Sequence, residues 1–413
     1  MKRRLIFDSI LNQKNSKKIS IILGPRQAGK TTILEELYKK LGGVFLDIDI
    51  FSNYEKISTY EKFINFIQLK GYKKDQKSFF YVFLDEFQRY ADLTIIMKNI
   101  YDHHSNIKIY ASGSSSLLIK NAIQESLAGR KQITHLYPLS FKEFLIFRER
   151  NDLLEEIENL KKIKTGNYSK LTPEVFKYLN EFMVFGGYPE VALSKTRKEK
   201  IEALRNIFDL YIKKDLVNFL KPAMIDSAHT LIKQLAINNG MIANYSNYGM
   251  RVGIDAKTVK NYIRILRETF LIIKLVPYFT NKNKEIAKIP KIYFLDNGVR
   301  NYFFNNFNDP EMRNDAGILF EGFYISEIIK SGEDPDNIKY YRTKIGSEVD
   351  VILDKVSEVI PIEIKYKKKL KESDARGLKK FMKEYKIPTG YLVNAGEINK
   401  EQDIKKIDCF NLR

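Results

Sequence analysis

The chain has 413 residues, with 70 Lys and Arg against 51 Asp and Glu, which gives a formal net charge of +19 at pH 7. This length predicts roughly two to four domains, each able to bury a core. The single cysteine, Cys409, excludes an internal disulfide framework and a cysteine zinc site, and the four histidines show no metal-ligand spacing. The basic excess favours a polyanionic partner, although the general richness in Lys, Ile and Asn accounts for part of it.

Neither a signal peptide nor a membrane span is expected. The apolar run after residues 2–4 ends at Asp8. The longest apolar stretch, near residues 270–279, is interrupted by Lys274 and Pro277. We therefore expect no membrane partner and a cytoplasmic location.

Residues 24–31 match the phosphate-binding pattern G-x-x-x-x-G-K-[ST] at every fixed position. The apolar run 19–23 before them predicts a buried strand, and residues 31–37 predict the helix that follows, so backbone N–H groups would point at a bound phosphate. We expect Lys30 to reach the β- and γ-phosphates of a bound nucleotide and the Thr31 hydroxyl to ligate Mg²⁺. The predicted nucleotide-binding residues are Gly24, Pro25, Arg26, Gln27, Ala28, Gly29, Lys30, Thr31 and Thr32. The alternative is a Gly-rich turn that binds nothing.

A second phosphate-site element follows at residues 79–86. The aromatic, apolar run 79–84 predicts a buried strand that ends in Asp85 and Glu86. Asp85 would hold Mg²⁺ through water, and Glu86 would act as the general base on the attacking water. An Asp-Glu pair after a strand is a weak signal alone, but its place after Lys30 predicts an ATPase rather than a passive nucleotide binder.

Two further polar residues are candidates for the same site. A third predicted strand, 107–111, runs into a Ser/Gly turn, where ATPases of the AAA+ type carry a polar sensor that Ser112 or Ser114 would supply. The alternative is an ordinary turn. Arg130 would contact the γ-phosphate, either in its own chain or in a neighbouring subunit of a homo-oligomer. The alternative is a surface arginine that binds nothing.

The pattern of the whole chain predicts a multidomain α/β protein. Residues 1–145 alternate strands and helices, as expected of a P-loop ATPase core with a parallel sheet. Residues 146–225 are helical in pattern and predict a lid beside the nucleotide. Residues 226–289 predict a winged helix-turn-helix, and residues 290–413 predict a mixed α/β, nuclease-like domain.

The predicted recognition helix of the winged helix covers residues 256–266, with Asp255 as its N-cap. Apolar residues of this helix recur at helical spacing and predict one buried face. Lys257, Lys260 and Arg264 lie on other faces and would meet DNA phosphates and base edges. The alternative is a winged helix that only packs against neighbouring domains.

The last segment carries a second set of acidic residues. Asp350 lies in the predicted strand 347–353, and Glu363 and Lys365 lie two apart on the predicted strand 359–365, so they share a face. A hairpin would bring Asp350 beside Glu363. An amphipathic helix over residues 319–329 bears Glu321.

These residues predict a metal-dependent phosphodiesterase site. Asp350, Glu363 and the Ile364 carbonyl would bind Mg²⁺ or Mn²⁺, with Glu321 as a further ligand. Lys365 would orient or help deprotonate the attacking water, and the basic run over residues 365–371, which includes Lys367, would bind the phosphate backbone. The alternative is a hairpin with an ordinary cross-strand Asp–Lys ion pair.

The motifs at residues 24–31, 84–86, 112–114, 129–130, 185–189, 257–259, 294–298, 348–350 and 362–365 follow one another in a recognisable order. In this order the chain resembles archaeal and bacterial AAA-type P-loop ATPases with a C-terminal domain of unknown function (DUF4143-like) of the restriction-endonuclease-like PD-(D/E)xK type. The resemblance covers nearly the whole chain and implies ATP rather than GTP as the nucleotide. One departure is that Asp350 follows Val349 rather than a proline.

Three hypotheses about function follow. ATP hydrolysis would control a metal-dependent nuclease, or an ATP-driven switch would bind DNA without cutting it. In a third hypothesis the chain is a scaffold that uses nucleotide to assemble with a protein partner. Salt-dependent DNA affinity would separate the first two from the third.

Overall fold

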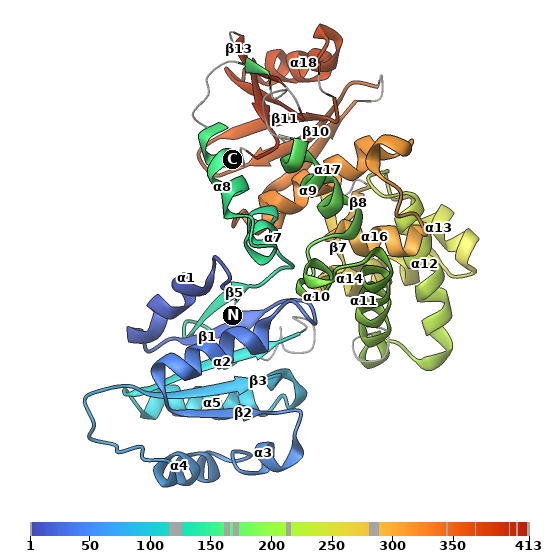
Figure 1. Ribbon diagram of the computed structural model, residues 1–413. Coiled ribbons are helices and arrows are strands. Elements are labelled where there is room, and N and C mark those ends of the chain that lie inside the picture. The colour runs from blue at the N-terminus through green and yellow to red at the C-terminus, as the bar shows by residue number, and fades with distance from the viewer. Residues whose placement is uncertain are drawn as a thin grey trace. The chain divides into compact units, whose positions relative to one another are not determined.

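The computed structural model describes residues 2–114, 126–160, 166–167, 173–211, 216–280, 289–343, 346–367, 369–395, 397–401 and 404–410 (Figure 1). The chain divides into two compact units. Unit 1 comprises Met1–Pro138 with Glu268–Phe270, and unit 2 comprises Leu139–Arg267 with Leu271–Arg413.

Unit 1 is built on a five-stranded sheet of order β2-β3-β4-β1-β5, in which every neighbouring pair is parallel. The strands are β1 (Ile19–Leu23), β2 (Val44–Asp47), β3 (Phe80–Asp85), β4 (Ile107–Gly113) and β5 (Lys131–His135). The helices are α1 (Phe7–Leu11), α2 (Lys30–Leu41), α3 (Phe51–Glu55), α4 (Tyr60–Leu69) and α5 (Leu93–His103), with 3-10 turns at Asn12–Asn15 and Phe87–Arg89. The predicted P-loop core with a parallel sheet is confirmed.

Helices cover both faces of this sheet, because adjacent strand residues point to opposite sides. Ile22 of β1 packs in a core with α1 and α2, whereas its neighbour Ile21 packs in a second core with α4 and α5. Continuous burial along β1 and β4 is the pattern expected of parallel strands that are covered on both faces.

Unit 2 contains a helical part and a large sheet. Its helices are α7 (Phe141–Phe147), α8 (Asn151–Leu160), α9 (Pro173–Phe185), α10 (Pro189–Leu193), α11 (Arg197–Leu210), α12 (Ile225–Ile237), α13 (Tyr245–Val252), α14 (Ala256–Glu268), α16 (Asn297–Phe304), α17 (Ala316–Lys330) and α18 (Arg376–Tyr385). Its strands are β6 (Gly166–Asn167), β7 (Ile272–Pro277), β8 (Lys291–Phe294), β9 (Ile338–Arg342), β10 (Glu348–Asp354), β11 (Val359–Lys365), β12 (Gly390–Asn394), β13 (Glu397–Glu401) and β14 (Ile404–Asp408).

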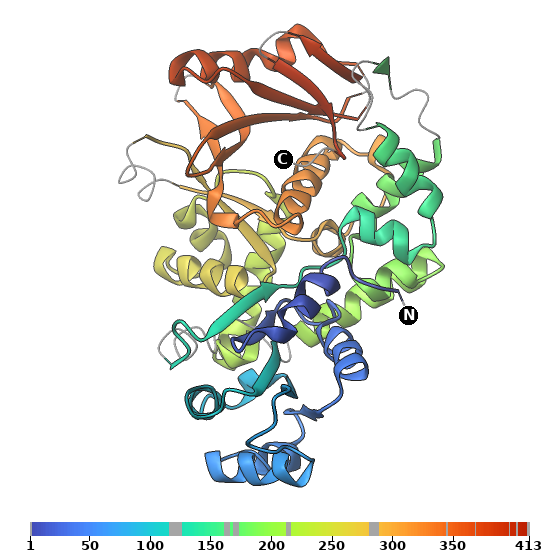
Figure 2. The ribbon, with the colours of Figure 1, turned by 90° about the vertical axis from the view of Figure 1, so that its left-hand side faces the viewer.

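The sheet of unit 2 has nine strands in the order β6-β13-β14-β12-β11-β10-β9-β7-β8. The two chemically important strands, β10 and β11, are antiparallel neighbours near its centre. Helix α18 packs on one face through Leu378 and Phe381, and α17 lies on the other side of the sheet, as Figure 2 shows. The strands predicted at 347–353 and 359–365 therefore form the expected hairpin.

The hairpin of β7 and β8 belongs to the same sheet. It is antiparallel, with Leu275 opposite Lys291, and β7 also pairs with β9 in parallel, with Val276 opposite Lys339. Helices α12, α13 and α14 precede it directly in sequence. The boundary predicted at residues 289/290 falls inside this hairpin, so the four-part division of the chain stays a prediction.

Helices α7 and α9 pack against α17 in the C-terminal part of the chain. The backbone N–H of Phe141 donates to Glu327 Oε2 at 2.8 Å, and the Phe141 ring contacts Phe182 and Phe323. This packing explains why unit 2 begins at Leu139. The start of unit 2 therefore differs from the domain boundary predicted at residues 145/146. The role of residues 146–225 as a lid beside the nucleotide stays a prediction.

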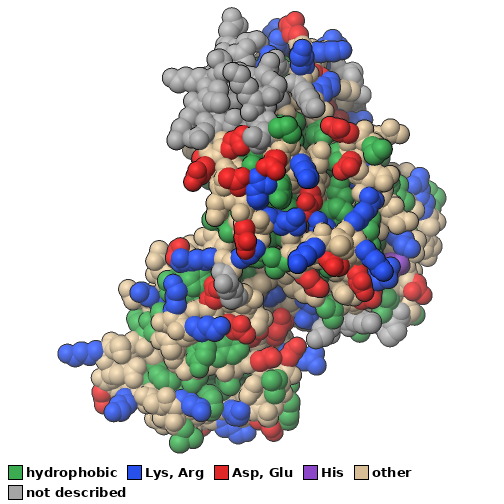
Figure 3. Space-filling model, viewed as in Figure 1, with side chains coloured by type: hydrophobic (Ala, Val, Ile, Leu, Met, Phe, Trp, Pro, Cys, Tyr) green, Lys and Arg blue, Asp and Glu red, His purple; other side chains and the backbone are tan. Residues whose placement is uncertain are grey.

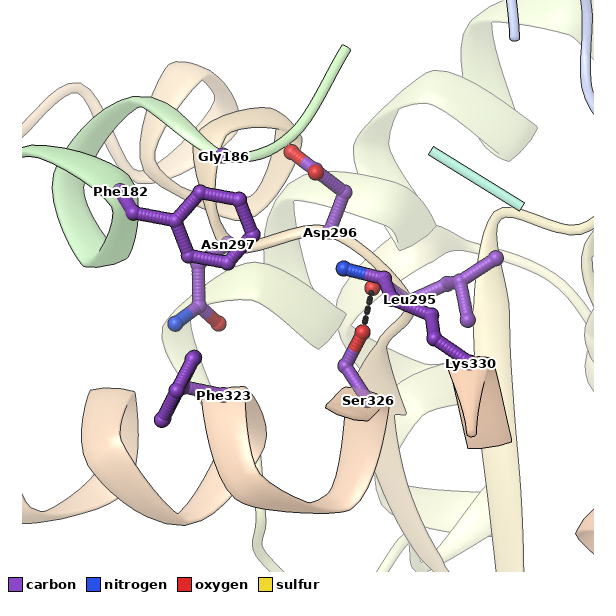
Figure 4. A pocket seen from close by; sticks show the side chains of 8 residues that line it. All are labelled: Phe182, Gly186, Leu295, Asp296, Asn297, Phe323, Ser326 and Lys330. Carbon is purple, nitrogen blue, oxygen red and sulfur yellow. Dashed lines mark hydrogen bonds between the residues drawn. The ribbon is translucent and has the colours of Figure 1, made fainter. Parts of the chain in front are cut away.

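Two motifs that are far apart in the sequence meet beside a small pocket in unit 2 (Figure 4). Asp296 accepts from the backbone N–H of Gly187 at 2.7 Å. A Cβ on Gly186 would lie 1.9 Å from Asp296 Oδ1, so only glycine fits there. Ser326 Oγ closes the pocket by donating to the Leu295 carbonyl at 2.7 Å. These contacts join the α9–α10 turn to the β8–α16 turn.

Candidate functional sites

The phosphate-binding loop connects the carboxyl end of β1 to α2. Gly24 begins it, and a Cβ there would lie 1.9 Å from the Leu136 carbonyl oxygen, so a side chain has no room. Gly29 ends the loop with φ of 99°, a conformation that glycine adopts without strain. The two fixed glycines of the motif therefore have separate structural reasons.

Lys30 is buried and crosses the loop. Its Nζ donates to the carbonyls of Gly24 at 3.0 Å and Pro25 at 2.9 Å. Helix α2 begins at Lys30, and its N-cap Gly29 offers no side-chain acceptor to the first turn. The N–H groups of that turn are suited to hold an anion. The buried Oε1 of Gln27 also has no hydrogen-bond partner, which fits a loop that binds a polar ligand.

Asp85 lies where residues from β3, α2 and β4 meet. Its Oδ2 accepts from Thr31 Oγ1 at 2.6 Å, and its Oδ1 accepts from Ser112 Oγ. Burial raises the pKa of Asp85, and the bonds from Ser112 and Thr31 oppose that rise. The structure thus brings together three of the predicted site residues, Thr31, Asp85 and Ser112, because β4 lies between β1 and β3 in the sheet.

Glu86 follows in the left-handed region with φ of 54°, which is uncommon for a non-glycine residue. Its backbone N–H donates to Ser112 Oγ at 3.3 Å, and its Oε2 accepts from Gln88 Nε2. Gln88 also donates to Ser114 Oγ at 3.0 Å. Of the two sensor candidates, Ser112 thus contacts Asp85, whereas Ser114 contacts Gln88. The sequence analysis did not name Gln88 as a site residue, although Gln88 lies only two residues after Glu86.

Arg130 lies away from the phosphate-binding loop of its own chain. Its carbonyl accepts from Ile19 N at 2.8 Å at the amino end of β1, whereas the loop follows the carboxyl end of that strand. Its guanidinium binds Asp102 through Nε at 2.7 Å and Nη2 at 3.1 Å. The guanidinium is thus engaged by Asp102, and its predicted contact with a γ-phosphate, in the same chain or in a neighbouring subunit, stays a prediction.

The second candidate site lies in unit 2, at one end of the β10–β11 ladder. That ladder begins at Val351 and Ile362, so Asp350 and Glu363 are the next residues on either strand. Asp350 Oδ2 accepts from Ile364 N at 2.8 Å. Lys365 Nζ donates to Glu363 Oε1 and lies 3.6 Å from Asp350 Oδ2. The predicted triad of Asp350, Glu363 and Lys365 is thus brought together.

Glu321 joins this group from α17. Its Oε1 accepts from the Tyr293 hydroxyl and lies 3.7 Å from Lys291 Nζ. Lys291 in turn lies 2.5 Å from Glu348 Oε1. The sequence analysis missed Lys291 and Tyr293, and it named Glu348 only as part of the motif at residues 348–350. The only signal for Lys291 was a charged residue at the start of an otherwise apolar strand.

Burial and neighbouring carboxylates disfavour the charged forms of the acidic groups in this cluster. Burial, with Asp350 close by, raises the pKa of Glu363 to about 8 and the pKa of Glu321 to about 7. Burial opposes the charge on Lys365, but Asp350 and Glu363 raise its pKa above the ordinary value. A buried carboxylate cluster of this kind is relieved by an added cation.

The Oε2 atom of Glu363 is consistent with the binding of such a cation. Glu363 is 7% exposed, and its Oε2 is buried with no hydrogen-bond partner. Among the residues that the structure describes, however, no group of three or more His, Cys, Asp or Glu side chains is placed so that it could hold a metal ion. Asp350, Glu363 and Glu321 supply carboxylate oxygens, the type of ligand that Mg²⁺ prefers.

The predicted nucleic-acid residues are on the surface of unit 2. Lys257, Lys260 and Arg264 are exposed on α14, and Asp255 Oδ1 accepts from Thr258 N at 2.8 Å, as an N-cap does. Lys367 is exposed and pairs with Asp374 at 2.6 Å. On the face seen in Figure 3, Lys and Arg side chains are interspersed with Asp and Glu. A nucleic-acid-binding surface must therefore be identified from the positions of particular basic side chains rather than from the net charge of the chain.

Among the described helices, none is both long enough and apolar enough to cross a membrane.

Three segments of the chain match known domain families. Residues 16–145 match an AAA domain, residues 176–310 match a domain of unknown function (DUF8612), and residues 316–412 match a domain of unknown function (DUF4143). The last match is the family that the sequence resemblance named.

Similar proteins extend over most of the chain. An uncharacterized protein of Methanocaldococcus jannaschii is 28% identical over 382 residues, which cover 90% of this chain and 80% of that protein. An uncharacterized protein of Haemophilus influenzae is 24% identical over 384 residues, which cover 88% of this chain and 86% of that protein.

A Walker-type ATPase of Pyrococcus abyssi is similar in structure, with a TM-score of 0.49 and 14% identity over 73% of this chain and 96% of that one. A likeness at this level carries no argument about function. The AAA-domain match and the geometry around Lys30 and Asp85 together support a P-loop ATPase domain at the start of the chain.

Proposed function

We propose that the chain is a Mg²⁺-dependent ATPase whose nucleotide cycle is coupled to a C-terminal domain that binds a divalent cation and cleaves nucleic acid. The observation that carries the ATPase part is the double hydrogen bond to Asp85 from Thr31 and Ser112. It brings the acid of the second motif to the hydroxyl of the first.

In the proposed ATPase cycle, the N–H groups of the loop and of the first turn of α2 hold the phosphates. Lys30 exchanges its loop carbonyls for β- and γ-phosphate oxygens. Mg²⁺, when bound, neutralises phosphate charge, and Thr31 and Asp85 are the residues that would hold it. Glu86 accepts a proton from the water that attacks the γ-phosphorus, and the bond to ADP breaks to release phosphate.

The proposal for the C-terminal domain is supported by the convergence of Asp350, Glu363 and Glu321 and by the unpartnered Glu363 Oε2. A divalent cation there, Mg²⁺ or Mn²⁺, would activate water and stabilise charge on a phosphodiester. Asp350, Glu363 and Glu321 would hold it. Lys365, already paired with both strand carboxylates, would orient the phosphate.

Nucleic acid is the proposed partner of the C-terminal domain and of α14. Three exposed basic side chains, Lys257, Lys260 and Arg264, lie on one helix, and Lys367 follows the site on β11. The net charge of +19 agrees with a polyanionic partner. Helices α12–α14 followed by the β7–β8 hairpin have the element order of a winged helix, which supports that assignment as part of the proposal.

The test is a cleavage assay on single-stranded, duplex and branched DNA with Mg²⁺ or Mn²⁺, with and without ATP. Wild type is compared with Lys30→Ala and Asp350→Ala, and ATP hydrolysis is measured on the same preparations. We expect Lys30→Ala to lower hydrolysis by at least about a hundredfold and Asp350→Ala to abolish cleavage while hydrolysis remains. Equal cleavage with and without ATP would contradict the coupling.

One observation favours a second candidate, an ATP-driven DNA-binding or assembly switch whose C-terminal domain does not cut. Lys291 and Lys365 already supply positive charge to the acidic cluster, and no ready-made set of three metal ligands occurs among the residues described. No cleavage of any substrate, by protein that hydrolyses ATP, would establish this alternative.

A further inference from the structure

Lys291 is a buried cation at the edge of the acidic cluster. It is 4% exposed, and its Nζ lies 2.5 Å from Glu348 Oε1 and 3.7 Å from Glu321 Oε1. The Tyr340 ring lies under the same ammonium group, with its centroid at 5.4 Å. A buried lysine costs free energy unless carboxylates compensate it, so this position is specific for positive charge.

This lysine lies outside the segment that matches the C-terminal family. It is the first residue of β8, whereas the match to the C-terminal family covers residues 316–412. Its backbone is fixed on both sides, because Lys291 pairs with Leu275 of β7 and forms a bridge with Ile242 in the α12–α13 connection. Tyr293, two residues later and therefore on the same face of β8, bonds to Glu321.

We propose that Lys291 is the internal counter-ion of the C-terminal cation site: it neutralises charge on Glu321 and Glu348 and competes with a divalent cation for Glu321. This inference rests on the proposed cation site in the C-terminal domain. Glu321 remains held by Tyr293 when Lys291 is removed, so loss of the lysine charge changes the electrostatic potential more than the geometry.

This competition couples the β7–β8 hairpin, which carries Lys291, to the proposed cation site. A cation on Glu321 and the ammonium of Lys291 repel one another at short range, so each weakens the hold of the other. By linkage, a ligand that shifts β8 changes cation affinity by the same factor as the cation changes affinity for that ligand. Strand β7, the partner of β8, follows the exposed basic helix α14 with only three residues between them.

The test is Mn²⁺ binding to the full-length protein without nucleotide, by electron paramagnetic resonance of free Mn²⁺. All variants carry Asp85→Asn, which removes the acid of the nucleotide site. We expect Lys291→Met to bind Mn²⁺ about tenfold more tightly than its parent and Lys291→Arg to bind it nearly as the parent does. Lys339→Met is the matched control, because Lys339 is equally buried on β9 but pairs with Asp354 at the far end of β10.

Each outcome of the Mn²⁺ titration either supports or overturns the role of Lys291. Tighter binding by Lys291→Met, with Lys339→Met unchanged, supports the inference. Equal binding by parent and Lys291→Met overturns the inference and leaves the cation site standing, whereas no binding by any variant overturns both. If Lys291→Met does not fold, Glu348→Gln replaces it. That change leaves Glu321 as the nearest carboxylate of Lys291, so Mn²⁺ should bind several-fold more weakly, and unchanged binding would again overturn the inference.

Discussion

At the scale of single residues, Ser112 is the link between the two acids of the nucleotide site. It donates to Asp85 and accepts from the backbone of Glu86. Ser114, two residues on, donates no bond to either acid and instead accepts from Gln88. The two serines were equal candidates from sequence, since only the twist and register of β4 decide which one reaches the acid.

We expect Ser112→Ala to lower the rate of ATP hydrolysis by about tenfold to a hundredfold, because a hydrogen bond to a charged group is lost. The matched variant Ser114→Ala should change it by less than about threefold. Steady-state phosphate release at saturating ATP measures both. Equal effects of the two substitutions would show that the difference in contacts has no catalytic consequence.

Lys108 gives a prediction about pH. It is fully buried in β4, donates to Ser20 Oγ at 2.8 Å, and burial lowers its pKa from 10.5 to about 7. Between these two values the unfolded chain binds a proton that the folded chain does not, so the free energy of unfolding rises with pH. Below pH 7 the full cost of burying the charge is present.

The comparison is denaturant unfolding of wild type and Lys108→Met from pH 7 to pH 10. The difference in unfolding free energy between them should change by up to about 1.4 kcal/mol per pH unit, in the direction that favours wild type at high pH. Parallel curves for the two proteins would contradict a shifted lysine.

At the scale of elements, strands and helices with continuous or periodic apolar patterns were predictable, and contacts between distant elements were not. The strand over 19–23 and the hairpin strand over 359–365 have the predicted bounds. The pairing of β7 with β9 was not foreseen, because register between distant strands leaves no local pattern. Lys291 was missed for the same reason, as its partners lie 30 and 57 residues away.

Helix α14 carries the prediction for nucleic acid. Replacing Lys257, Lys260 and Arg264 by Ala should weaken duplex binding and lower the slope of log affinity against log salt by about 2 to 3. Arg197, Lys198 and Arg205 are exposed basic residues on α11, and their replacement by Ala is the matched control. Fluorescence anisotropy over a range of NaCl concentrations measures both. An unchanged slope in the α14 variant would assign DNA contact to another surface.

At the scale of the whole molecule, the chain passes between the two units after Pro138, after Arg267 and after Phe270. Each unit has its own sheet, and the two proposed sites are in different units. The division could not be read from sequence, because no linker of Gly, Pro or Ser marks the crossing points. What sequence did supply was the order of the motifs.

We expect calorimetry to resolve two unfolding transitions, one for each unit. Mg²⁺ with ADP at a hundred times its dissociation constant should stabilise unit 1 by about 2.7 kcal/mol and leave the other transition nearly unchanged. Lys30→Ala should abolish this shift. A single transition that moves as a whole would mean that the units unfold together.

The nine-stranded sheet limits how the chain can be divided or recombined. A fragment that starts with α17 would carry β9 without β7, its partner at Val276 and Pro277, and would expose the backbone groups of that edge. Such an edge invites pairing with other chains, so the fragment would aggregate more readily than the parent. The segment from residue 316 onward therefore cannot be exchanged alone among proteins of this kind. It has to be transferred together with the β7–β8 hairpin, which includes Lys291.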